Sequence, residues 1–131
     1  MPRWKSRLGA AAGAFLLLSG FAHTFLGTAA MREEMTRASV PAELARGLTV
    51  GWVFGGAAMF VFGAVAVWTF LRAGQGRPVS TAPTLATAVG YLGFGIWAEV
   101  FSGMDPFFLM FLVPAAMLLA ASLPLSSSET R

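Results

Sequence analysis

The sequence predicts an all-α protein, a four-helix antiparallel transmembrane bundle with short loops that forms one integral membrane domain over residues 1–131. Two observations lead to this prediction. The chain is 56% hydrophobic and only 11% charged, whereas soluble domains carry about 25% charged residues. The charged residues also divide the chain into four uncharged runs, and a helix needs about 20 apolar residues to cross a bilayer. The predicted helices span residues 8–31, 48–71, 82–103 and 106–123.

The first predicted helix carries the chain's only histidine and a regular row of glycines. Gly13, Gly20 and Gly27 are seven residues apart, a spacing that keeps small residues along one seam of a helix pair. In lipid, such seams let helix backbones approach closely. His23 lies near this seam and is expected to face protein. Signal-peptide apolar cores are about 7–15 residues long, so this longer run favours an uncleaved helix.

Capping residues place the later helix boundaries. Ser39 followed by Pro41 is typical of a helix start, with the hydroxyl as the cap and proline in the first turn. In the same way, Asp105 and Pro106 predict the start of the fourth helix. Pro114 falls inside that helix and predicts a kink, because proline removes one backbone hydrogen bond.

Composition also excludes several classes of function. The chain has no cysteine, which excludes disulfides, thiolate metal sites and iron–sulfur ligation. The nine basic residues lie in loops and termini, so they form no stripe for nucleic acid. Their distribution follows the positive-inside rule and predicts a bacterial cytoplasmic membrane protein with both termini cytoplasmic. In the first loop, Glu33 and Arg37 are spaced to form a helical ion pair.

Two ionisable side chains are expected within membrane depth, His23 and Glu99. In the predicted topology their depths differ by roughly 6 Å, and a buried carboxylate requires pairing or hydration. The sharper hypothesis is therefore a polar ligand site in which His23 faces Glu99 and Tyr91 or Thr24 completes the pocket. The alternative is structural: His23 bonds a neighbouring helix, and Glu99 meets water at the outer interface.

No catalytic residue set and no cofactor are predicted. The serines lie in turns, in the tail or beside glycine, without a histidine–acid partnership, so enzymatic activity is not expected. A single histidine supplies one ligand, while zinc sites need three or four, and no metal site is predicted. A haem would need His23 from two copies in a dimer, or a methionine as the second axial ligand.

The segment Ser19-Gly20-Phe21-Ala22-His23-Thr24, together with the length and four predicted helices, resembles small uncharacterised four-helix bacterial membrane proteins, loosely similar to DoxX-like proteins. The resemblance implies a membrane helix bundle and transfers no catalytic residue. The layout also resembles small multidrug-resistance transporters in size. Their hallmark is a membrane-embedded glutamate in the first helix, whereas the candidate glutamate here is Glu99 in the third.

Two classes of function follow from these observations. The first is a non-enzymatic accessory or scaffold component of a membrane complex, which the many glycine seams favour. The second is a protein that binds or transports a small molecule, lipid or proton at a His23–Glu99 pocket. The expected partners are the lipid bilayer and either a second copy of the chain or a larger membrane complex.

Overall fold

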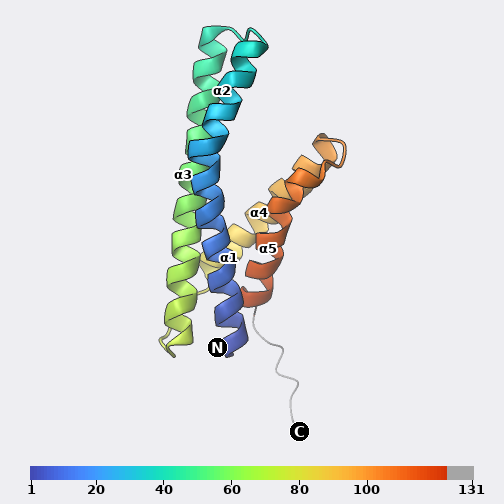
Figure 1. Cartoon of the computed structure of the whole chain (residues 1–131). Coiled ribbons are helices and arrows are strands. Elements are labelled where there is room, and N and C mark those ends of the chain that lie inside the picture. Colours follow the sequence, from blue (N-terminus) through green and yellow to red (C-terminus); the bar gives the residue numbers. More distant parts are fainter. Residues whose placement is uncertain (124–131) are drawn as a thin grey trace.

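The computed structural model describes residues 1–123, and in this part of the chain every regular element is a helix (Figure 1). The end of the predicted domain, residues 124–131, lies outside the described residues. The elements are α1 (Arg3–Phe21), the π-helical η1 (Ala22–Gly27), α2 (Thr28–Arg37), α3 (Ala42–Gly74), α4 (Ala82–Phe101), the 3₁₀-helical η2 (Pro106–Phe108) and α5 (Leu109–Ser122). The predicted all-α class is confirmed.

The first two predicted helices are longer than expected. α1, η1 and α2 join into one 35-residue helical segment, Arg3–Arg37, in place of 8–31, and α3 covers 33 residues in place of 48–71. Both extend because charged residues at their ends, such as Glu33 and Arg37, form ion pairs one helical turn apart instead of ending the helix. The predicted Glu33–Arg37 pair is confirmed, with 2.8 Å between Nη2 and Oε1.

The predicted cap at Ser39 is wrong. α3 begins at Ala42 after Pro41, and no side chain caps this end. Ser39 instead has a φ of 53° and belongs to the tight turn between α2 and α3. The cap at Asp105 is confirmed, because its Oδ1 accepts a hydrogen bond of 3.0 Å from the Phe107 amide. Pro114 lies inside α5, as predicted, and is fully buried.

The glycine seam of the first helix packs against a glycine seam on α3. A Cβ atom added at Gly13 would lie 2.9 Å from the Gly63 carbonyl oxygen, and one added at Gly20 would lie 3.1 Å from that of Gly56. The contact residue that lies seven positions later on α1, Gly20 after Gly13, is therefore matched by one that lies seven positions earlier on α3, Gly56 before Gly63. The predicted close approach is confirmed, and it takes place within this chain.

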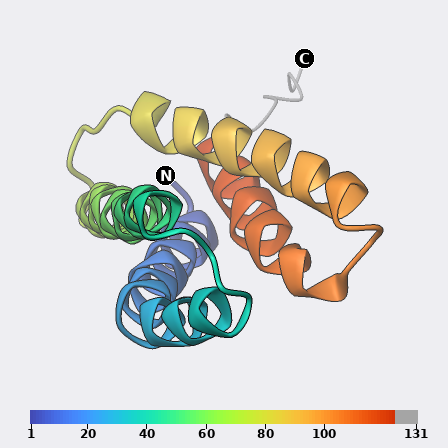
Figure 2. The same cartoon turned by 90° about the horizontal axis from the view of Figure 1, so that it is seen from above.

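α4 and α5 form a second pair that meets α1 and α3 at one end only. A core cluster at this junction joins all four long helices through Leu16, Phe70, Ala88 and Leu118. Toward the loops at residues 38–41 and 102–105, the two pairs diverge (Figures 1 and 2). α2 contacts α3 and η1 but neither α4 nor α5.

Polar side chains are buried at the junction end. Lys5, which the sequence places in a basic tail, lies within α1 at 4% exposure, and its Nζ donates to the Leu123 carbonyl. Ser6 donates to the Phe70 carbonyl at 2.7 Å. The hydroxyls of Thr84 and Ser122 lie 2.9 Å apart. These bonds link α1 to α3 and α5, and α4 to α5, where partners for buried polar groups are required.

Three helical segments of the described chain are long and apolar enough to cross a membrane: Arg3–Arg37, Ala42–Gly74 and Ala82–Phe101. The segment that corresponds to the fourth predicted span, Pro106–Ser122, is apolar but shorter. The predicted bounds of 82–103 and 106–123 are close to those observed, because loop residues 102–105 separate the two helices as the sequence indicates.

Candidate functional site

The divergence of the two helix pairs leaves a large open groove between α3 and the α4–α5 pair. Its volume is about 1160 Å³, and side chains from η1, α2, η2 and α1 complete its walls. None of the lining residues is Asp, Glu, Lys or Arg. We call this hollow the α3–α4 groove. It is suited to an apolar occupant, because no charged group is present to orient a charged one.

Glycines line both long walls of the groove. Gly47, Gly51 and Gly55 follow each other at four-residue intervals on α3, and Gly90 of α4 lines the same groove. A Cβ atom added at Gly47, Gly51 or Gly90 would meet no heavy atom within 4 Å. These glycines therefore differ from Gly13 and Gly63, where an added Cβ would collide with the opposite backbone.

Aromatic rings cover the α4–α5 side of the groove. Phe111 of α5 lies edge-on to Phe94 at a centroid distance of 4.9 Å and is tilted against Tyr91 at 6.0 Å. Tyr91 in turn meets Phe62 of α3 edge-on at 6.2 Å. Such contacts add about 0.5–1.5 kcal/mol each beyond the area that they bury. The aromatic wall is therefore a rigid surface.

His23 and Trp52 are joined by two hydrogen bonds, each from one side chain to the other residue's carbonyl. Its Nε2 donates to the Trp52 carbonyl at 2.9 Å, while the Trp52 Nε1 donates to the His23 carbonyl at 2.9 Å. The two rings stack with centroids 4.1 Å apart. His23 belongs to the π-helical turn η1, so this turn is the part of the first helical segment that Trp52 holds. This geometry matches the structural alternative for His23.

The four predicted site residues do not form one pocket. His23 and Tyr91 both line the α3–α4 groove, from η1 and α4 respectively. Thr24 packs its hydroxyl against Gly56 of α3 and finds no hydrogen-bond partner among the described residues. Glu99 lines a separate, smaller hollow.

The expected pairing of His23 with Glu99 is therefore wrong. Their similar depth along the helices was the basis of the expectation, but depth does not fix lateral distance. η1 contacts α1, α2 and α3, whereas α4 contacts α3, α5 and η2. The two side chains therefore line separate hollows, His23 the α3–α4 groove and Glu99 the smaller one.

The described residues offer little to a metal ion. Among residues 1–123, no three His, Asp or Glu side chains are grouped so that they can hold one. A haem iron bound through Nε2 of His23 would have to displace the hydrogen bond to Trp52. The geometry at His23 thus favours packing between helices over ligation.

Sequence reasoning missed the groove although its signals are present. The spacing of Gly47, Gly51 and Gly55 is visible in the sequence, yet only the fold shows that this side of α3 is open. Trp52 lies 29 residues from His23 in the sequence, so its position gave no hint of their contact.

No protein-family model, curated protein or solved structure matches this chain. The resemblance to DoxX-like proteins therefore stays a prediction.

Proposed function

We propose that the protein is a small integral membrane protein whose four helices span the bacterial cytoplasmic membrane as one antiparallel bundle. Large apolar side chains on the outer faces of the helices support this proposal, including Val50, Phe54 and Trp68 of α3, which are between 57% and 74% exposed and lie outside the groove. Exposed apolar surface of this extent is rare on soluble monomers. A bilayer covers it.

The lengths of the helices fit a bilayer whose outer surface lies below the tip of α2. The segment Pro106–Ser122 has 17 residues and is about 25 Å long, near the lower limit for a span. Arg3–Arg37 is about 52 Å long and exceeds the hydrocarbon thickness of about 30 Å. Figure 1 shows that α2 and the start of α3 extend past the end of the α4–α5 pair.

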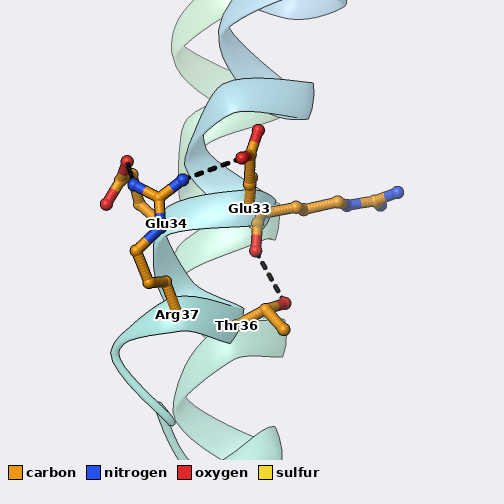
Figure 3. A network of polar contacts seen from close by, with 5 residues as sticks. Glu33, Glu34, Thr36 and Arg37 are labelled. Carbon is orange, nitrogen blue, oxygen red and sulfur yellow. Dashed lines mark hydrogen bonds and ion pairs between the residues drawn. The ribbon is translucent and has the colours of Figure 1, made fainter.

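The projecting tip is polar. Arg37 pairs with both Glu33 and Glu34, and the Thr36 hydroxyl donates to the Arg32 carbonyl at 2.9 Å (Figure 3). These groups are exposed and suited to water. Among the described residues, the tip carries three basic residues and the opposite side carries five: Arg3, Lys5, Arg7, Arg72 and Arg77. By the positive-inside rule, both termini are cytoplasmic.

Within this membrane, the protein acts as a non-enzymatic accessory component that holds an uncharged transmembrane helix of a partner in the α3–α4 groove. The observation that most supports this role is the open surface of the groove at Gly47, Gly51 and Gly90. In lipid, helices associate through close packing at small residues. An open track of small residues on both walls allows a third backbone to approach.

The free-energy penalty of glycine inside a helix supports a role for these glycines in binding a partner. A glycine inside a helix is less favourable than alanine by about 0.5–1 kcal/mol. At Gly13 and Gly63, the close contact of α1 with α3 offsets this cost. At Gly47, Gly51 and Gly90, no contact with residues 1–123 offsets it. A partner helix that packs there supplies the missing contact.

A second candidate function is the binding of a lipid chain or a small apolar molecule in the same groove. The aromatic wall of Phe94, Tyr91 and Phe111 favours this candidate, because flat rings suit a slender apolar ligand. Cavities that bind small molecules are typically about 300–1,000 Å³ and mostly apolar. The groove is slightly larger than this range.

Photo-cross-linking from inside the groove tests both candidates. A benzophenone amino acid at Phe94, which lines the groove, is compared in native membranes with one at Val89, which is 58% exposed on α4 outside it. We expect a discrete polypeptide adduct from position 94 only. Adding Gly51→Leu, which fills the groove, should reduce the adduct at least tenfold. Adding Gly93→Leu should leave it unchanged, because Gly93 is equally open but lies outside the groove.

The identity of the adduct separates the candidates. A specific lipid or small-molecule adduct at position 94 that Gly51→Leu removes favours the second candidate over the first. The same mixture of bulk-lipid adducts from positions 94 and 89, unaffected by Gly51→Leu, contradicts both.

A further inference from the structure

Glu99 is a buried carboxyl group that the fold does not use. It lies near the end of α4, and only 6% of the residue is exposed. Its Oε1 is buried and has no hydrogen-bond partner among the described residues. Buried carboxyl groups in native proteins are normally paired or hydrogen-bonded. The missing partner therefore points to a group that is not part of residues 1–123.

Glu99 lines a hollow of about 340 Å³ between α4 and α5, distinct from the α3–α4 groove. Every other side chain that lines this hollow is apolar: Ile96, Val100, Met104, Pro106, Leu109 and Leu112. The elements packed here against α4, namely η2 and α5, carry no ionisable side chain. The nearest such residue in sequence, Asp105, accepts the Phe107 amide as a cap.

The chemistry of the hollow selects the kind of occupant. One carboxylate attracts a cation, and the apolar walls favour a cation that carries hydrocarbon. A primary ammonium group has three N–H donors, but the side chains of the hollow provide acceptors only at Glu99. A quaternary ammonium group has no N–H donor to satisfy, so one carboxylate and apolar contacts are sufficient for it.

We propose that the hollow beside Glu99 binds a quaternary ammonium group. Glu99 lies two residues before the end of α4, which in the proposed membrane topology is close to the depth where hydrocarbon gives way to headgroups. The group can therefore reach the hollow on a choline headgroup of a lipid or on a free organic cation. The proposal does not depend on the occupant of the α3–α4 groove, because the two hollows share no lining residue.

Choline and its neutral isostere 3,3-dimethylbutan-1-ol test the proposal on the full-length protein in detergent. We expect choline to raise the Tm of the wild type in a saturable manner and the isostere to leave it unchanged. Glu99→Gln, which keeps the shape and removes the charge, should abolish the choline effect. Glu43→Gln should keep it, because Glu43 is an exposed partner of Arg46 on α3.

A second variant guards against an altered fold in Glu99→Gln. Leu109→Trp leaves the carboxyl in place and fills the hollow from a side chain that is 48% exposed. It should also abolish the choline effect. An equal rise in Tm with choline in the wild type, Glu99→Gln and Leu109→Trp, or no rise in any of them, overturns the proposal.

The source of the group is determined in mixed phosphatidylcholine–phosphatidylglycerol vesicles. Native mass spectrometry that finds phosphatidylcholine enriched on the wild type, but not on Glu99→Gln, assigns the hollow to a lipid headgroup. A choline effect on Tm without this enrichment assigns it to a free cation. Equal lipid retention by both proteins, together with no choline effect, contradicts the proposal.

Discussion

Gly63→Leu is expected to separate α1 from α3 and to lower the free energy of unfolding by about 3 kcal/mol, the upper end for overpacking. A Cβ atom at this position would lie 2.8 Å from the Gly13 carbonyl oxygen and 2.8 Å from the Leu17 amide nitrogen. Both atoms belong to the opposite helix backbone, so they cannot yield by a change of rotamer. The helices must move apart along the whole seam.

Denaturation in mixed micelles, followed by circular dichroism, measures this effect. Gly93→Leu is the matched control, because it makes the same change on a helix where nothing lies within 4 Å. We expect the control to be neutral or slightly stabilising, since leucine is the better helix former by up to about 1 kcal/mol. Equal losses for the two variants would contradict the described seam.

Phe70→Ala is expected to destabilise the junction of the two helix pairs by about 3 kcal/mol. Phe70 is fully buried, belongs to the core cluster with Leu16 and Leu118, and packs against Gly9 of α1. Removing its ring leaves a cavity among α1, α3 and α5. This loss is at the lower end of the range for buried Phe→Ala substitutions, because in a membrane the Phe70 ring of the unfolded protein contacts lipid instead of water.

Phe54→Ala is the control for this variant. It deletes the same ring from the same helix, but Phe54 is 74% exposed. Its free energy of unfolding should change by less than about 0.5 kcal/mol, as is usual for surface positions. If both variants lose the same stability, the junction is not where the helix pairs are held together.

Local sequence signals predicted the local features of the fold. The uncharged runs indicated the helices, and the cap at Asp105 and the pair of Glu33 with Arg37 followed from spacing within one turn. The glycines at seven-residue intervals indicated a packing seam, and the structure shows that Gly63 and Gly56 of α3 form its other half. Each of these features depends on neighbours in the sequence.

The features that depend on lateral arrangement were not predictable in the same way. The sequence gives the depth of His23 and Glu99 but not the divergence of the helix pairs that separates them. Lys5 has the composition of a solvated tail, and only the arrival of Leu123 beside it makes it a buried donor. The contact between Trp52 and His23 likewise joins residues that are 29 positions apart in the sequence.

Cysteine labelling tests the membrane topology most directly, because the chain has no cysteine of its own. Single cysteines replace Ala38 in the loop after α2, Gln75 after α3, and Val61, which is 59% exposed in the middle of α3 and lines the groove. A membrane-impermeant maleimide reacts with thiolates that meet water. In intact bacteria we expect it to label position 38 alone. After the membrane is opened, it should also label position 75, while position 61 stays unlabelled. Labelling of position 61 as readily as position 38, or of positions 38 and 75 from the same side, would contradict the account.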